Sequence, residues 1–92
     1  MVKIGKYNYE LSNRKNKKLK VDVNGVWIHF GGPQGSKHFF DKTGLLNKSL
    51  NHKDEKIRKA WKARHEKIKD KEGRLVYKDP NSPSYHSYKV LW

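Results

Sequence analysis

The chain has 92 residues, and 22 Lys and Arg against 9 Asp and Glu give it a formal net charge of +13. This length predicts one small domain over residues 1–92 and excludes a second core or a large cofactor-binding fold. The lack of cysteine excludes a disulfide scaffold, a thiolate zinc site and a cysteine nucleophile. Leu, Ile, Val and Phe make up 20 of the 92 residues, so we expect a thin core to which Trp and Tyr add aromatic surface.

The positive charge is concentrated in two segments. Residues 1–20 carry a net charge of +6 and residues 51–74 carry +5, whereas the rest is nearly neutral. This distribution favours a polyanionic partner, with nucleic acid first, an acidic protein surface second and an anionic membrane third, although a basic surface also serves solubility alone. No apolar run is long enough to span a membrane and no signal-peptide core follows Met1, so we expect a cytosolic chain without membrane contact.

The first third of the chain reads as strands. Apolar residues alternate in Lys6–Leu11, Lys18–Val23 and Val26–Phe30, which is the period of a half-buried strand. Asn24-Gly25 joins the last two as a two-residue hairpin turn, because both turn positions favour positive φ. The register pairs Val23 with Val26, Val21 with Ile28 and Leu19 with Phe30 on the core face, and Asp22 with Trp27 and Lys20 with His29 on the other.

Two helices are predicted in the second half. The longer one covers Asn51 to about Lys69, with Asn51 as its N-cap and an apolar stripe of Ile57, Trp61 and Ile68. The glycine at position 73 stops this helical pattern, and Leu75–Lys78 reads as a short strand. Ser82 and Pro83 resemble the N-cap and first position of a short C-terminal helix. The predicted fold is therefore α+β: a three-stranded antiparallel sheet packed on one long amphipathic helix, plus a short C-terminal helix.

Arg64 falls inside the helical stripe expected to be buried. A buried guanidinium needs a carboxylate, backbone carbonyls or an external anion. We favour a structural pair that ties the helix to another segment over a ligand site. The preferred partner is Asp41 or the terminal carboxylate of Trp92, and Asp54 is a further candidate.

A dense cation run and one face of the hairpin form the candidate nucleic-acid interface. Cations at this density can grip phosphates without reading bases, and an aromatic residue among them can stack on an unpaired base. The run is equally consistent with a solvated turn, and Trp27 could instead be covered by another part of the chain. The candidate residues are Arg14, Lys15, Lys17, Lys18, Lys20, Trp27 and His29.

Catalytic interpretations find little support. The five His have no metal-site spacing, and Gly31–Gly35 lacks the Lys-Ser/Thr of a phosphate-binding loop. A small nuclease built on His38 with Asp41, or His52 with Asp54, is the weakest hypothesis, because metal-dependent nucleases need several converging carboxylates. We therefore expect no enzyme activity, no catalytic residue, no metal and no cofactor.

Several motifs resemble a short uncharacterised domain of large DNA viruses and large phages. They are N-R-K-N-K-K-L-K-V-D-V-N-G-V-W-I-H-F-G (13–31), T-G-L-L (43–46), L-N-H-K-D (50–54), R-H (64–65) and S-Y-H-S-Y-K-V-L-W (84–92). The residues that match the recurrent positions of that family are His29, His52, Arg64, His65 and Trp92. Members of the family often have a Trp-rich ending, where this chain has Tyr85 and Tyr88 instead. The family carries no established activity, so the resemblance implies a viral or phage origin and little chemistry.

These observations predict a non-catalytic viral or phage nucleic-acid-binding protein that contacts the phosphate backbone of DNA or RNA with low sequence specificity. The alternative is a minor virion structural or interaction protein whose basic surface meets an acidic protein, such as a capsid protein, or the packaged genome. Either function implies a location in the host cytoplasm or the virion, reached without secretion through a signal peptide.

Overall fold

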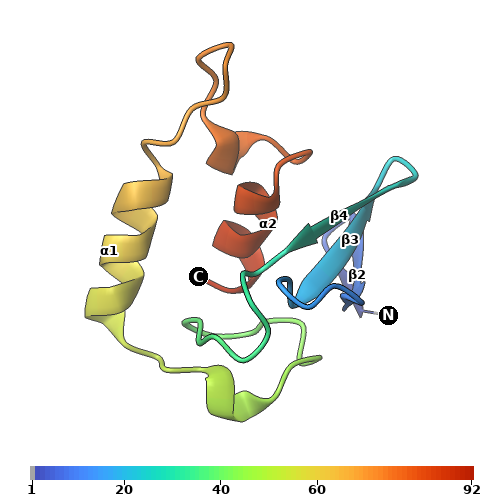
Figure 1. Cartoon of the computed structure of the whole chain (residues 1–92), viewed down its shortest axis with the longest axis vertical. Helices are drawn as coiled ribbons and strands as arrows, with labels where there is room; N and C mark the ends of the chain where they lie inside the picture. Colours follow the sequence, from blue (N-terminus) through green and yellow to red (C-terminus); the bar gives the residue numbers. More distant parts are fainter. Residues whose placement is uncertain (1) are drawn as a thin grey trace.

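The chain folds into an antiparallel sheet with two α-helices on one side of it (Figure 1). The structure, a computed structural model, describes residues 2–92. The elements are β1 (Val2–Ile4), β2 (Tyr7–Leu11), β3 (Leu19–Val23), β4 (Val26–Phe30), α1 (Glu55–His65) and α2 (Pro83–Val90), with two short 3₁₀ helices, η1 (Lys48–Leu50) and η2 (Val76–Lys78). The predicted α+β class is confirmed, but the sheet has four strands rather than three.

The additional strand is β1, which pairs antiparallel with β2 and places Val2 opposite Tyr9. Three residues are too few to show a period of two, so the alternation that predicts β2 gives no signal for β1. The strands follow one another across the sheet in the order β1-β2-β3-β4, each joined to the next by a short connection.

The β3–β4 hairpin has the predicted register on both faces. Asn24 and Gly25 have φ values of 52° and 83°, as a tight two-residue turn requires. The carboxylate of Asp22 accepts a hydrogen bond of 2.8 Å from the amide of Gly25, which fixes the turn further. One predicted core residue lies outside the core, because Val26 sits at the tip of the hairpin and is 62% exposed.

The C-terminal helix, and not the long one, covers the apolar face of the sheet. Ser82 caps α2 and Pro83 is at its start, as predicted. Val90 at the end of α2, and Leu91 after it, are completely buried against the sheet residues. The core consists of Tyr7, Tyr9, Leu19, Val21, Val23, Phe30, Val90 and Leu91.

Helix α1 is shorter than predicted and begins later. Asp54 is its N-cap, since its carboxylate accepts a hydrogen bond of 2.9 Å from the amide of Lys56. The predicted cap, Asn51, lies in the preceding loop and binds His38 instead. The helix ends at His65, before the glycine at position 73 that was expected to stop it.

The face that α1 turns to the body also differs from the predicted stripe. Ile57 and Ile68 are 46% and 44% exposed. The inward side carries Trp61, which stacks on Trp92 with 4.8 Å between ring centroids and 6° between planes. On the same side, the guanidinium Nε of Arg58 donates a hydrogen bond of 2.8 Å to the main-chain oxygen of Trp92.

The predicted pair of Arg64 with Asp41 is wrong. Arg64 is exposed, and within residues 2–92 its guanidinium forms no ion pair. The carboxylate of Asp41 instead accepts hydrogen bonds from the amides of Thr43 and Leu46. The stacking of Trp61 on Trp92 turns the helix relative to the predicted orientation. The arginine that binds Trp92 is therefore Arg58, nearly two turns before Arg64.

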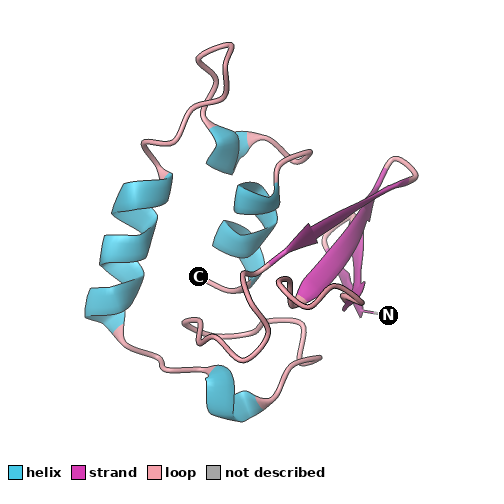
Figure 2. Ribbon diagram, viewed as in Figure 1, coloured by secondary structure: helices cyan, strands magenta, loops and turns pink. Residues whose placement is uncertain are grey.

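The segment between β4 and α1 is mostly loop and runs along the bottom of the view in Figure 2. It is fastened to the end of α2 by main-chain hydrogen bonds from Phe40 to Leu91 (3.0 Å) and from Lys42 to Val90 (2.9 Å). Residues 75–78, where the sequence suggests a short strand, contain η2 instead. Within residues 2–92, no helix combines the length and the apolar character that crossing a membrane requires.

A test of the core concerns the hydroxyl of Tyr9. His86 donates from Nε2 to the Pro80 carbonyl (2.7 Å), so its Nδ1 accepts the hydrogen bond of 2.9 Å from the Tyr9 hydroxyl. Both residues are completely buried, and we expect Tyr9→Phe to lower the free energy of unfolding by about 1–3 kcal/mol because Nδ1 loses its donor. Urea unfolding measures this, with Tyr7→Phe as the matched control.

The Tyr7 ring also packs edge-on against His86, but its hydroxyl makes no hydrogen bond among the described residues. Equal destabilisation by the two substitutions would contradict the assigned role of the Tyr9 hydroxyl.

Candidate nucleic-acid interface

The predicted interface residues separate into three places. Arg14 and Lys15 are exposed in the loop between β2 and β3, and Lys17 is half-buried at its edge. Lys18 turns inward and is only 3% exposed. The remaining residues, Lys20, Trp27 and His29, lie on the open face of the sheet.

The basic loop is joined to the glycine-rich turn at residues 31–35. The side-chain amide of Gln34 donates to the carbonyl of Arg14 (2.9 Å), and its main-chain amide donates to the carbonyl of Lys15 (3.2 Å). Gly31 has a φ of 99°, and a Cβ there would come within 3.1 Å of Leu91 and of Lys18. A glycine is therefore required for the turn to approach the loop so closely.

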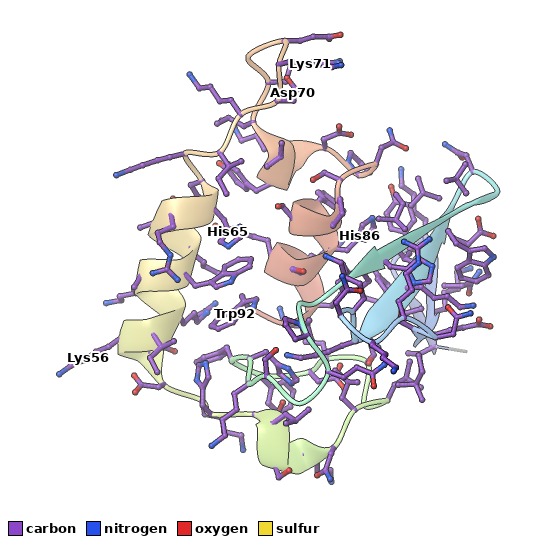
Figure 3. All side chains as sticks on the ribbon, in the orientation of Figure 1. Lys56, His65, Asp70, Lys71, His86 and Trp92 are labelled. Carbon is purple, nitrogen blue, oxygen red and sulfur yellow. The ribbon has the colours of Figure 1, made fainter. Side chains whose placement is uncertain are left out.

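These two loops form one wall of a cleft of about 440 Å³, which we call the loop–helix cleft. Lys17 comes from one loop and Lys37 follows the other, while Trp61 and His65 of α1 form the opposite wall. The start of α2 and Trp92 complete the lining. In Figure 3, His65 and Trp92 lie in the space between α1 and α2, whereas Lys56 points away from the body. The volume is within the range of small-molecule sites, roughly 300–1,000 Å³.

The aromatic wall of the cleft is a continuous stack. His65 lies 3.7 Å from Trp61 between ring centroids, Trp61 lies against Trp92 on its other face, and Trp92 contacts His52 at 5.2 Å. Both faces of Trp61 are occupied, so this indole cannot stack on a base. Burial, followed by the neighbouring Arg64, lowers the pKa of His65, which keeps the ring uncharged near pH 7.

A buried polar chain supports the floor of the cleft. Lys18 Nζ donates to His38 Nδ1 (3.1 Å), and His38 Nε2 donates to the side-chain oxygen of Asn51 (2.7 Å). Burial lowers the pKa of Lys18 to about 8, against the opposing effect of Asp41. Burial, followed by the charge of Lys18, lowers the pKa of His38. The prediction that Lys18 contacts phosphate is therefore wrong, because its ammonium group is enclosed and positions the loops instead.

The second face of the hairpin is open at Trp27, which is 41% exposed, so the alternative that the chain covers it is contradicted. Lys20 Nζ lies 4.6 Å from the Trp27 ring centroid and 3.8 Å from a carboxylate oxygen of Glu10. His29 Nδ1 and the Ser12 hydroxyl form a hydrogen bond of 2.7 Å. Burial, followed by nearby cations, lowers the pKa of His29, so this face presents a neutral imidazole.

Sequence reasoning missed Lys37 and the α1 wall of the cleft. Lys37 is an isolated cation in a nearly neutral segment, and Trp61 reads as a core residue. The available signal was the run of three glycines in residues 31–35, which marks a place where backbone segments approach each other.

Comparisons with models of protein families, with curated protein sequences and with solved structures gave no significant match. Over residues 2–92, no group of three or more His, Asp or Glu side chains converges in a way that could hold a metal ion. The function of the cleft is therefore argued from the residues that line it.

The buried ammonium of Lys18 predicts a pH dependence of stability. Its pKa is about 8 in the folded protein and 10.5 ordinarily, so the unfolded chain binds more protons between these values and stability rises with pH. From pH 7.5 to 9.5 we expect a gain of roughly 1–2 kcal/mol from this group. Urea unfolding at both pH values should show a smaller gain in Lys18→Met, which keeps the apolar stem.

Lys62, whose pKa is also lowered, titrates in the same direction in both proteins, so the difference between them isolates Lys18. Identical gains in the two proteins would rule out a shifted Lys18.

Proposed function

We propose that the protein is a non-catalytic nucleic-acid-binding protein that grips the phosphate backbone at the loop–helix cleft. The observation that carries this proposal is the convergence of Lys17 and Lys37, from two separate loops, on one cleft. Within the part of the chain that the structure describes, neither ammonium group is paired with a carboxylate. Both are therefore available to replace the counterions of a phosphate backbone.

The exposed cations beside the cleft extend the same surface. Arg14 and Lys15 lie in the loop that Gln34 fastens to the cleft wall. Their backbone is thus held in place while their side chains remain free to reach a neighbouring phosphate. This arrangement supports several phosphate contacts along one strand and no reading of base edges.

The aromatic residues favour the same interpretation. Since both faces of Trp61 are covered, this indole offers a base no stacking surface, and we expect recognition in the cleft to depend mainly on charge. Trp27 is the exposed indole, and it lies on the sheet next to Lys20. Any stacking on an unpaired base would therefore take place at Trp27 and not at Trp61.

The resemblance to a domain of large DNA viruses and phages supports a viral genome or transcript as the ligand. A location in the host cytoplasm or the virion remains a prediction on the same basis. The alternative partner, an acidic protein such as a capsid protein, would use the same cations. Titration with polyglutamate separates the two: binding of polyglutamate without binding of any oligonucleotide would favour the protein partner.

The decisive test is the salt dependence of binding. For single- and double-stranded DNA and RNA we expect log affinity to fall linearly with log salt. Replacing Lys17 and Lys37 together by Gln should flatten that slope by about 1.4 for single strands and about 1.8 for duplex DNA, because two contacts are lost. Fluorescence anisotropy titrations from about 50 to 200 mM salt measure the slope.

The matched control is the pair Lys56→Gln and Lys59→Gln. Both residues are exposed on α1 and do not line the cleft, and the pair removes the same net charge. If this control flattens the slope as much as the cleft variant does, binding is a matter of overall charge and the assigned site is wrong. Undetectable binding at about 50 mM salt would overturn the proposal itself.

Trp27 separates stacking from packing. We expect Trp27→Ala to leave the thermal midpoint nearly unchanged, because the ring is exposed, and to weaken single-strand binding by about 1–3 kcal/mol. Calorimetry and anisotropy titrations measure the two effects. Unchanged affinity for single strands would exclude a stacking role for Trp27 and leave the cleft as the interface.

A further inference from the structure

A second basic hollow lies beside α2 and has no counterpart in the sequence-based prediction. It measures about 460 Å³ and is more open than the loop–helix cleft. Three tyrosines, Tyr77, Tyr85 and Tyr88, form its surface. Four lysines surround them: Lys42, Lys62, Lys78 and Lys89. We call it the tyrosine–lysine hollow.

The two hollows open in different directions around the helix pair. On α2, Ser84 and Ser87 line the loop–helix cleft, whereas Tyr85 and Tyr88 line the tyrosine–lysine hollow. At about 100° per residue, these two pairs point to different sides of the helix. On α1, Trp61 and its neighbour Lys62 divide in the same way between the two hollows.

Cations and rings are interleaved in this hollow. Lys62 Nζ lies 4.6 Å from the Tyr88 ring centroid, and Lys78 Nζ lies 5.7 Å from that of Tyr77. The centroids of these two rings are 5.0 Å apart and their planes meet at 36°, so the rings form a tilted pair. Cation–π contacts at exposed sites are weak, so an entering base can displace the ammonium groups toward its own phosphates.

One carboxylate, that of Glu66, contacts the tyrosine pair and orients the Tyr88 ring. The hydroxyl of Tyr88 donates a hydrogen bond of 2.6 Å to Glu66. That bond raises the pKa of Tyr88 to about 12, so the phenol stays neutral. Against the four lysines this leaves a strongly positive surface, which suits a single strand with unpaired bases and phosphates.

We propose that the tyrosine–lysine hollow is a second site for single-stranded nucleic acid, so that one protein molecule holds two strands at once. This inference rests on the proposed function, because bridging requires the loop–helix cleft to bind as well. The two hollows open roughly 100° apart around α2, so we expect a strand of only a few nucleotides to occupy one hollow and leave the other for a second strand. The protein would therefore bring two nucleic-acid segments together.

The test is capture of one strand by another. A short oligothymidine is fixed to beads, and a fluorescent oligothymidine of the same length is added with the protein. These strands cannot pair with each other, so retention of fluorescence requires a protein that holds both. We expect capture at limiting protein, and loss of capture when protein exceeds the strands, because each strand then occupies its own molecule.

The variant that isolates the second site is Lys62→Gln with Lys78→Gln. We expect it to bind one strand per molecule instead of two, to lose capture, and to keep the binding of the loop–helix cleft. Lys78→Gln alone, at an exposed position, serves as a second variant, and circular dichroism checks the fold of both. Lys56→Gln with Lys59→Gln is the charge-matched control and should still capture.

The outcomes separate the two proposals. If no oligonucleotide binds, the proposed function fails and this inference fails with it. If strands bind at one per molecule and are not captured, the proposed function stands and this inference is overturned. Capture by both lysine variants, or capture only by a dimer seen in sedimentation velocity, also overturns it.

Discussion

The stack of Trp61 on Trp92 is the contact on which both hollows depend. Helix α1 packs no apolar stripe against the sheet, and its isoleucine at position 57 faces water. It is held to the body by this stack, by the hydrogen bond from Arg58 to the main-chain oxygen of Trp92, and by the hydrogen bond from Tyr88 to Glu66 at its end. Trp61 and His65 of α1 form one wall of the loop–helix cleft, and Lys62 of α1 lines the tyrosine–lysine hollow, so the placement of this helix shapes both.

Buried polar groups extend a core that is small for a chain of this length. Small domains bury little apolar surface and are only marginally stable. The interior of this domain also contains two hydrogen-bonded histidines. His86 joins Tyr9 of the sheet to the Pro80 carbonyl, and His38 joins Lys18 to Asn51. Each imidazole uses both nitrogens, so each ties together segments that are distant in the sequence. Burial favours the neutral ring in both, which limits the charge repulsion inside a basic protein.

Local signals predicted the parts of the fold that local chemistry determines. Asn24-Gly25 sets the register of the hairpin, and Ser82-Pro83 sets the start of α2, because turns and caps depend on adjacent residues. The orientation of α1 was predicted wrongly because a hydrophobic stripe counts Ile57 and Ile68 as buried. A stacking indole with a partner elsewhere in the chain outweighs both isoleucines.

The candidate site was less predictable than the fold for the same reason. Arg14, Lys15 and Lys17 stand out as a cation run, but the inward turn of Lys18 depends on His38, twenty residues later. Lys37 reaches the cleft only because Gln34 fastens two loops together. Such contacts leave no periodic trace in the sequence, since they join single residues across long separations.

The narrow attachment of α1 divides the molecule into parts of unequal resistance to hydrogen exchange. The amides of β2 and β3 lie in the middle of the sheet beneath α2, so their protons are released only when the whole domain opens. The amides of α1 are protected by the helix itself and by a few side-chain contacts, chiefly those at Trp92 and the hydrogen bond from Tyr88 to Glu66, so we expect local opening of that helix to expose them. We therefore expect strong protection in the sheet and α2 and weaker protection in α1, whose local opening would disassemble the loop–helix cleft without unfolding the domain.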